Sequence, residues 1–381
     1  RDDVESRGLG DVYKRQVQVI DKKDLQVLIL TDGYNIHHLS GYRGHTGMLV
    51  AFQGEQYILT DSRYTEQVEL EAPEFTCVDI GREGYSKTIA GMLQKAFAKE
   101  GRSTLRIGFE NKEISYMQYQ AFVDTFAKEL TGMQVEFVPL EDAVNVYREV
   151  KTEDEIAKLA RAEQIGDEAF TEIVKFIHEN WKNGLTEQRV ALQLEYEMRL
   201  RGAEGTSFDT IAASGSNSSL PHAMPQPKLL AEGDFLTMDF GCMYQGYCSD
   251  MTRTIHIGEV VEPEQKKVYD TVLQAQLAAL SVVKPGMVCS DVDKCARDII
   301  ADAGYGDYFG HGLGHSVGLF IHEEPRFSMK CDAVLKPGVV ITVEPGIYLP
   351  GRFGVRIEDM IVVTEDGYQN LASSPKELIC V

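Results

Sequence analysis

The chain has 381 residues, of which 43% are hydrophobic and 25% are charged, a composition typical of a soluble globular protein with two or three domains. The formal net charge of −21 argues against nucleic acid or an anionic membrane as the main partner, since both are bound through excess Lys and Arg, and no apolar run approaches the roughly 18 residues of a membrane span. The seven cysteines are scattered without a C-x-x-C pair, which favours a reduced, cytoplasmic protein over a disulfide framework or a thiolate metal site.

Residues 1–16 carry neither the apolar core of a signal peptide nor the apolar stripe of an amphipathic helix. We therefore expect a non-native or disordered lead-in there and base no fold prediction on it.

Residues 17–145 alternate strand and helix signals. A short buried strand is expected over 25–31, followed by a hairpin with arms at 46–52 and 56–61 on either side of Gly54. Apolar periodicity then predicts helices over 62–70, 86–101 and 115–130, with strands over 106–110 and 134–140. This order of elements predicts an α/β domain.

The second region, 151–381, begins with a helix-start signal, because Thr152 and Glu155 have the spacing of a capping box. From there one order of elements occurs twice: two helices, a strand and a hairpin. The first set is expected over 153–180, 187–202, 208–214 and 235–257, and the second over 263–283, 290–303, 315–321 and 339–363. The repeat predicts two similar halves related by a pseudo-two-fold axis.

Each predicted hairpin carries two carboxylates on otherwise apolar strands. Asp239 and Asp250 are centred on the turn at 244–245, so we expect them nearly opposite each other, with Cβ atoms about 4.5–5.5 Å apart if they pair directly. Glu344 and Glu358 are centred on Gly351 in the same way. A single Asp in a hairpin usually faces solvent or forms a turn, but two symmetric pairs favour a shared function.

The four carboxylates would converge if the two halves pack face to face. They cannot all stay ionised in one cleft unless cations supply the opposite charge. The segment GHGLGHSVGLFIHEEP (310–325) offers His311, His315 and His322 as an imidazole ligand. An oxygen-rich set with one His suits Mn²⁺, Fe²⁺, Co²⁺ or Zn²⁺, and two such ions would activate water for attack on a carbonyl group. The glycines could also suggest a phosphate cradle, but the segment lacks the P-loop lysine and the dinucleotide fingerprint spacing.

Four stretches, LTMDFGCMYQGYCSDMTRT, GHGLGHSVGLFIHEEP, ITVEPGIY and GVRIEDMIVV, together resemble the M24 metallopeptidases of pita-bread fold, a family that includes methionine aminopeptidase, aminopeptidase P and prolidase. The resemblance spans 151–381 and implies a pita-bread catalytic domain there. It also implies two divalent metal ions, for which we expect Mn²⁺, with Co²⁺, Fe²⁺ or Zn²⁺ as alternatives. The family's ligands, in the order Asp, Asp, His, Glu, Glu, correspond to Asp239, Asp250, His315, Glu344 and Glu358. In this correspondence Asp250 and Glu358 bridge the two ions.

Other stretches indicate the branch of the family. NIHHLSGYRGHTG and LTDSRYTEQ resemble the N-terminal domain of aminopeptidase P, prolidase and creatinase, which methionine aminopeptidases lack. HEEP (322–325) and SGSNSSLPHAMP (214–225) resemble the proline-specific branch, which implies that His222 and His322 line the substrate site and contact the scissile peptide. Tyr348 and Arg356 would lie close by, with Arg356 either orienting Glu358 or holding a substrate carboxylate. Creatinase shares the fold but lacks the metal ligands, so the complete set argues against it.

The resemblance therefore implies hydrolysis of Xaa-Pro bonds at the N-terminus of short peptides by a hydroxide that bridges the metals. Glu344 would carry the proton, while His222 and His322 would stabilise the oxyanion or the leaving nitrogen. The chain length slightly favours an Xaa-Pro dipeptidase over an Xaa-Pro aminopeptidase that accepts longer peptides. A pita-bread protein that binds peptides or partners without catalysis is a third alternative, which the complete ligand set disfavours. We also expect a homodimer in which the first domain covers the cleft.

Overall fold

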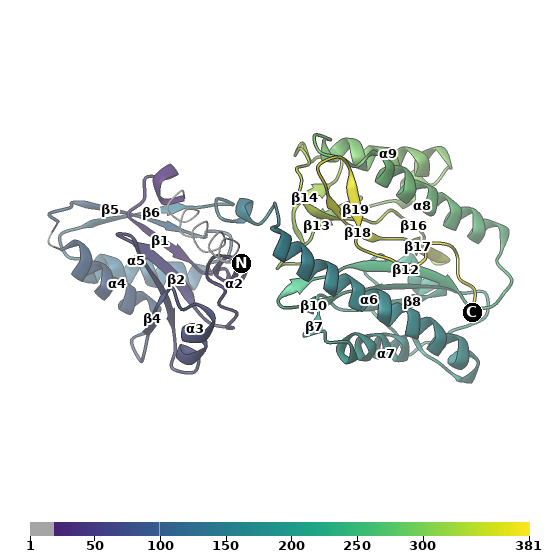
Figure 1. The fold of residues 1–381 in the computed structure, drawn as a ribbon, viewed down its shortest axis with the longest axis horizontal. Helices are drawn as coiled ribbons and strands as arrows, with labels where there is room; N and C mark the ends of the chain where they lie inside the picture. The colour runs from purple at the N-terminus through teal and green to yellow at the C-terminus, as the bar shows by residue number, and fades with distance from the viewer. Residues whose placement is uncertain (1–18, 99) are drawn as a thin grey trace, which may run out of the picture. The chain divides into compact units, whose positions relative to one another are not determined.

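The computed structural model describes residues 19–98 and 100–381 (Figure 1). The expectation for residues 1–16 lies outside the described residues. The chain divides into two compact units, one ending at Arg148 and the other beginning at Glu149.

The first unit is built on a six-stranded mixed sheet with the strand order β4-β3-β2-β1-β5-β6 (Figure 1). Its strands are β1 (Val27–Leu30), β2 (Met48–Phe52), β3 (Glu55–Thr60), β4 (Thr76–Asp79), β5 (Thr104–Phe109) and β6 (Gln134–Pro139). β1 pairs antiparallel with β2 and parallel with β5. The predicted hairpin of β2 and β3 is confirmed, and its turn residues Gln53 and Gly54 both have positive φ.

Helices cover both faces of this sheet, because side chains that alternate along β1 are buried on opposite sides. Val27 and Ile29 pack in one cluster with α4 (Gly84–Phe97) and α5 (Tyr116–Glu129). Leu28 and Leu30 pack in the other with α2 (Gly33–Ser40) and α3 (Thr65–Glu71). The α/β prediction is confirmed, although the sequence interpretation missed α2 and β4.

The second unit contains two helix pairs around a set of antiparallel strands (Figure 1). The helices are α6 (Glu153–Asn180), α7 (Glu187–Leu200), α8 (Pro263–Val282) and α9 (Cys289–Asp302). The strands are β7 (Gly205–Thr206), β8 (Ile211–Ser214), β9 (Phe235–Phe240), β10 (Cys242–Tyr244), β11 (Tyr247–Cys248), β12 (Met251–His256), β13 (Gly314–Ser316), β14 (Glu323–Phe327), β15 (Val340–Val343), β16 (Gly346–Leu349), β17 (Phe353–Arg356), β18 (Asp359–Val363) and β19 (Tyr368–Asn370). The capping box that starts α6 at Thr152 is formed as predicted.

The predicted repeat is confirmed by the order in which the strands pair. β8, β9 and β12 are neighbours in one sheet, and β13, β15 and β18 are neighbours in the same order in another. Apolar side chains of α6 and α7 pack on the first set, and those of α8 and α9 pack on the second. The two sets meet where the backbone N–H of Glu358 donates to the carbonyl of Thr252 at 3.1 Å, so the last strand of each half lies at the centre.

The second hairpin has the predicted register. Val343 pairs with Asp359 and Gly346 pairs with Arg356, so the break between these pairs places Glu344 opposite Glu358.

The first hairpin differs from the prediction, because Asp239 pairs with Thr252 rather than with Asp250. Its turn is Gln245–Gly246, one residue later than expected, and both residues have positive φ, as a tight two-residue hairpin turn requires. Asp250 is therefore a diagonal neighbour of Asp239 on the same face of the hairpin.

The strand expected over 315–321 is also shorter than predicted. β13 ends at Ser316, where the register shifts between His315 and Ser316, and residues 317–322 form a loop before β14. Within residues 19–98 and 100–381, no helix combines the length and the apolar character that crossing a bilayer requires.

Candidate metal centre and substrate cavity

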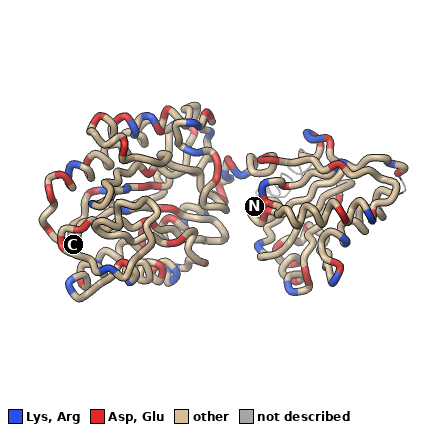
Figure 2. The backbone as a smooth tube through the Cα atoms, turned by 180° about the vertical axis from the view of Figure 1, so that it is seen from behind, with Lys and Arg blue, Asp and Glu red and all other residues tan. Residues whose placement is uncertain are grey.

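A cavity of about 690 Å³ lies in the second unit and is lined by residues from both halves. All five predicted metal ligands line it: Asp239, Asp250, His315, Glu344 and Glu358. Acidic positions thus occur in the interior of this unit as well as on its surface helices (Figure 2). The pseudo-symmetric strands explain the convergence, since each half contributes one hairpin with two carboxylates.

His315 lies at the centre of this cluster. Its Nε2 is 3.4 Å from Asp250 Oδ2 and 3.6 Å from Glu344 Oε1. Its Nδ1 lies 3.2 Å from the Ser316 carbonyl, so the ring proton sits on Nδ1 and Nε2 faces the carboxylates with a free lone pair. Atoms of Asp250, His315 and Glu358 that could bind a metal lie within 4.8 Å of one another. Of the three candidate imidazoles, His315 is the one brought to the carboxylates.

The charges in this cluster are poorly compensated by the protein itself. Burial, reinforced by the neighbouring carboxylates, raises the pKa of Asp250 and Glu344 well above the usual range. Burial and Asp239 raise the pKa of Glu358 to about 8. Burial and the adjacent His322 lower the pKa of His315 to about 3, which keeps its imidazole neutral.

The donor set fits divalent cations. Asp239 Oδ1 and Glu358 Oε1 are buried carboxylate oxygens that accept no hydrogen bond from the part of the chain that the structure describes. Buried anionic oxygens are strongly disfavoured without a partner, and several carboxylates with one neutral imidazole are what Mn²⁺, Fe²⁺ or Co²⁺ bind well. The residues present therefore suit the ions that the resemblance implies.

Arg356 is buried beside the cluster, and most of its donors are already engaged. It donates to Asp239 Oδ2 at 2.6 Å, to Tyr348 OH at 2.7 Å and to Thr252 Oγ1 at 3.0 Å. Arg356 thus orients Asp239 directly and reaches Glu358 only through Thr252, whose hydroxyl donates to Glu358 Oε2 at 2.6 Å. This contact set leaves little of the guanidinium for a substrate carboxylate.

Tyr348 and His311 form a layer behind Arg356. The Tyr348 hydroxyl is 2.9 Å from His311 Nε2, and His311 Nδ1 is 2.8 Å from the Gly312 carbonyl. Burial and the positive charge of Arg356 lower the pKa of His311 to about 4. His311 is therefore a hydrogen-bonded neutral imidazole that supports Tyr348.

His222 and His322 both line the cavity and are exposed to it. The His322 ring lies edge-on to the His315 ring with centroids 4.5 Å apart, so it is adjacent to the carboxylate cluster. Burial and Arg326 lower the pKa of His322.

Sequence reasoning missed part of the cavity wall. Phe208, Ile211 and Met224 give it an apolar side, and Arg326 gives it a cationic group. Arg326 could have been found, because period-2 alternation along β14 places it on the same side as His322. It forms an ion pair with Glu324 at 3.0 Å and has an exposed side chain.

Comparison with known proteins identifies the class. Residues 157–365 match Metallopeptidase family M24, and residues 14–150 match the Creatinase/Prolidase N-terminal domain. The chain belongs to the M24 metallopeptidase family, which confirms the predicted pita-bread fold with its N-terminal α/β domain and implies divalent metal ions at the carboxylate cluster.

Individual relatives are similar to this chain over nearly its whole length. The chain is 36% identical to an Xaa-Pro dipeptidase of Pyrococcus horikoshii, over 97% of this chain and 99% of the relative. Its fold is similar to that of an Xaa-Pro dipeptidase from Bacillus anthracis, with a TM-score of 0.88, 38% identity and coverage of 98% and 100%. It is also similar to an X-Pro aminopeptidase from Thermotoga maritima, with a TM-score of 0.83, 35% identity and coverage of 96% and 100%.

Proposed function

We propose that this chain is a metal-dependent Xaa-Pro dipeptidase. The observation that carries the proposal is the cluster of carboxylates and one neutral imidazole on the wall of a cavity of about 690 Å³, in which two buried carboxylate oxygens have no hydrogen-bond partner among the described residues. The similarity to dipeptidases across nearly the whole chain supports the choice of reaction.

The residues that would hold the ions are Asp239, Asp250, His315, Glu344 and Glu358, all of which line the cavity. Bound there, the ions would polarise the substrate carbonyl and activate water for hydrolysis. Mn²⁺ as the resident ion, a homodimeric assembly and a cytoplasmic location stay predictions that rest on the family resemblance.

The protein's own side chains supply proton transfer and orientation. Glu344 is the group proposed to carry the proton, because its side chain is 16% exposed whereas that of Asp250 is 6% exposed. His222 and His322 stand at the cavity wall as hydrogen-bonding groups for the developing oxyanion or the leaving nitrogen.

The remaining wall of the cavity suits an Xaa-Pro dipeptide. The nitrogen of an Xaa-Pro bond carries no hydrogen, so the pyrrolidine ring needs apolar surface rather than an acceptor, and Phe208, Ile211 and Met224 provide such surface. A dipeptide also ends in a carboxylate close to the scissile bond. Because most donors of Arg356 are engaged by the protein, we assign the binding of that carboxylate to Arg326.

The second candidate is an Xaa-Pro aminopeptidase, favoured by the likeness to the Thermotoga maritima structure. The two are separated by measuring hydrolysis of Ala-Pro, Ala-Pro-Ala and Ala-Ala after removal of metal with a chelator and re-addition of Mn²⁺. Metal-restored cleavage of Ala-Pro alone supports the dipeptidase. Cleavage of Ala-Pro-Ala supports the aminopeptidase, and cleavage of neither proline peptide by protein with two bound metals would refute both.

Arg326 provides a sharper test of the dipeptidase. Arg326→Ala should raise KM for Ala-Pro roughly tenfold or more, because a charge-assisted hydrogen bond to a carboxylate contributes about 1.5–3 kcal/mol. Arg326→Lys should recover part of the loss. An unchanged KM would remove Arg326 from this role.

A further inference from the structure

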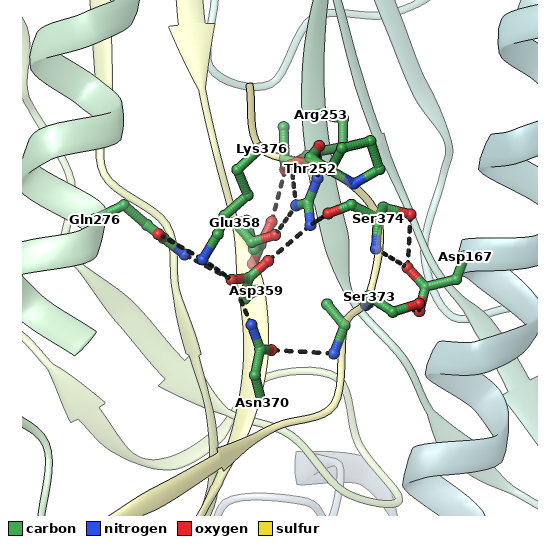
Figure 3. Close-up of polar contacts among 12 residues, drawn as sticks. Asp167, Thr252, Arg253, Gln276, Glu358, Asp359, Asn370, Ser373, Ser374 and Lys376 are labelled. Atoms are coloured by element: carbon green, nitrogen blue, oxygen red, sulfur yellow. Dashed lines mark hydrogen bonds and ion pairs between the residues drawn. The ribbon is translucent and has the colours of Figure 1, made fainter. Parts of the chain in front are cut away.

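A second buried group of charges lies directly behind the metal cluster, centred on Arg253 of β12 (Figure 3). The Arg253 side chain is 2% exposed and forms an ion pair at 2.8 Å with Asp359, whose side chain is 0% exposed. Removing two charges from water costs several kcal/mol, so a buried pair persists only where further hydrogen bonds satisfy both groups.

The guanidinium of Arg253 uses every donor that it has. An arginine carries five N–H groups in a fixed plane. Nη2 donates to Asp359 Oδ1 and to the Ser374 carbonyl at 2.8 Å each, and Nε donates to the Pro375 carbonyl at 3.1 Å. Nη1 donates to the carbonyl of Thr252 at 3.0 Å and to the carbonyl of Glu358. Four of these five acceptors are backbone atoms.

These bonds join three segments that are far apart in the sequence. They connect β12, the residue that precedes β18, and residues 370–376, which we name the C-terminal segment (Figure 3). The C-terminal segment is itself fixed to α6, because the backbone and hydroxyl groups of Ser373 and Ser374 all donate to the Asp167 carboxylate, at 2.6–2.8 Å.

Asp359 is held as completely as its partner. Its Oδ2 accepts hydrogen bonds from Lys376 at 2.7 Å, Asn370 at 2.8 Å and Gln276 at 2.9 Å, while Oδ1 accepts from Arg253 (Figure 3). The C-terminal segment thus supplies two of the four donors, and α8 supplies a third. A carboxylate fixed by four donors gives Arg253 a single orientation.

That orientation sets the distance between the starts of β12 and β18, which Asp250 and Glu358 directly precede. Arg253 donates hydrogen bonds to the carbonyl of Thr252, which lies two residues after Asp250, and to the carbonyl of Glu358 itself. The same two strands bring the Thr252 hydroxyl to 2.6 Å from Glu358 Oε2. We name the Arg253–Asp359 pair and its hydrogen bonds the brace. A shift of this brace would move Glu358 relative to Asp250.

We propose that Arg253 and Asp359 are positioning residues for the metal centre, holding Asp250 and Glu358 at the separation that two cations need. The inference rests on the proposed function, because it requires that these carboxylates bind metal. Neither residue is among those that line the cavity. Groups that orient metal ligands in this way typically contribute about 10–100-fold to metal affinity.

The planar fork of arginine is needed for this role. A lysine would keep the positive charge beside Asp359 but has only three donors on one atom, and it cannot reach carbonyls of both strands and of the C-terminal segment. Arg253→Lys should therefore fold and bind Mn²⁺ about 10–100-fold more weakly than the wild-type protein. Asp359→Asn, which keeps the shape but not the charge, should weaken Mn²⁺ binding by a smaller factor.

The test is calorimetric titration of metal-free wild-type, Arg253→Lys and Asp359→Asn proteins with Mn²⁺, together with the Mn²⁺ electron paramagnetic resonance spectrum. The control is Val292→Ala, which removes buried volume from α9 in the core of the second half, on an element that supplies no hydrogen bond to Arg253 or Asp359 in the part of the chain that the structure describes. Urea unfolding of the metal-free proteins shows how much stability each variant has lost. A merely structural role predicts that affinity falls no further in Arg253→Lys than in the control at an equal loss of stability.

The outcomes are distinguishable. A 10–100-fold weaker affinity in Arg253→Lys but not in Val292→Ala, with activity recovered when Mn²⁺ exceeds the weakened Kd, supports the inference. Equal affinity in wild-type and Arg253→Lys proteins, each binding two ions, overturns the inference and leaves the proposed function intact. A wild-type protein that binds no Mn²⁺, Co²⁺, Fe²⁺ or Zn²⁺ overturns both.

Discussion

Glu358 and Asp359 are adjacent in the sequence and equally buried, at 1% and 0% exposed, yet their surroundings are opposite. Successive side chains of an extended segment point to opposite sides. Glu358 therefore faces the cavity, where burial and Asp239 raise its pKa to about 8. Asp359 faces the brace, where Arg253 and Lys376 outweigh the effect of burial and hold its pKa below the usual range.

The difference separates two reasons for burying a carboxylate. Asp359 has its counter-charges within the protein, so its charge contributes to the fold. Glu358 has the hydroxyl of Thr252 as a partner and other carboxylates as neighbours, and one of its oxygens accepts no hydrogen bond from residues 19–98 or 100–381. A carboxylate of this second kind keeps its charge at neutral pH when cations from outside the protein accompany it. Function and stability are thus assigned to adjacent residues of one extended segment, Glu358 and the first residue of β18.

The largest expected effect follows from neutralising the metal-facing member of the pair. Glu358→Gln should lower activity by more than about 100-fold, because it removes a shared ligand rather than a group that supports one. The metal-free variant should be at least as stable as the metal-free wild-type protein, since the substitution removes a poorly compensated buried charge. Metal content by mass spectrometry and urea unfolding check both statements. A variant that is fully active with two ions bound would contradict the ligand assignment.

Removing the carboxylate of Asp359 should, in contrast, lower the stability of the metal-free protein. Asp359→Ala leaves Arg253 buried without its counter-charge, and breaking a buried ion pair in this way typically costs about 3–5 kcal/mol. Urea unfolding of the metal-free protein measures the loss. The matched control is Asp298→Ala on α9, whose ion pair with Lys294 has side chains 57% and 68% exposed and should contribute little. Equal effects at the two positions would show that the brace does not support the fold.

The environment of Glu358, the carboxylate cluster that faces the cavity, could be predicted well from the sequence. Centring the second hairpin on Gly351 gave the correct register for Glu344 and Glu358. The reason is that the pairing of β15 with β18 and the pairing of β16 with β17 share one register, although the ladder is interrupted at these two residues. The first hairpin was centred one residue early, since Gln245–Gly246 is a weaker turn signal than Asn-Gly or Asp-Gly. The error did not affect the cluster, because a diagonal neighbour lies on the same face.

The brace around Arg253 could not be predicted in the same way. Its partners Glu358 and Asp359 are 105 and 106 residues away along the chain, and its backbone acceptors carry no side-chain signature. Elements with long apolar periodicity, such as α6 and α8, were predicted nearly to their ends, whereas the short α2 and β4 were missed. Local pattern fixes an element, but which side chains meet across two halves depends on the packing of both.

Supplying metal should sharpen the contrast between the two adjacent carboxylates. Mn²⁺ at about 100 times its Kd should stabilise the wild-type protein by about 2.7 kcal/mol, because only the folded cluster binds it. Glu358→Gln should lose this gain, and Asp298→Ala should keep it. The difference in unfolding free energy with and without Mn²⁺ measures the gain. A gain retained in Glu358→Gln would place the bound metal elsewhere in the protein.

Glu110 of the first unit is a third kind of buried carboxylate, whose hydrogen-bond donors within residues 19–98 and 100–381 are uncharged groups. Its oxygens accept from the backbone N–H groups of Thr31 and Asp32, at 2.5 and 2.7 Å, and from the amide of Asn35 at 2.6 Å. Burial outweighs these bonds and raises its pKa to about 7. Because the folded state then holds the proton more tightly than the unfolded state, its contribution is complete below the unfolded pKa of about 4.5 and is lost as pH rises through 7.

The unfolding free energy should therefore fall by about 1–3 kcal/mol between pH 5 and pH 8 through Glu110 alone, since each unit of pKa shift corresponds to 1.36 kcal/mol. Glu110→Gln should lack this part of the pH dependence, so the difference between variant and wild-type proteins should change with pH in favour of the variant. The exposed Glu55→Gln is the control, and metal-free protein is used for both. A difference that stays constant from pH 5 to pH 8 would mean that two backbone N–H groups and one neutral amide are enough to keep the pKa of Glu110 from rising.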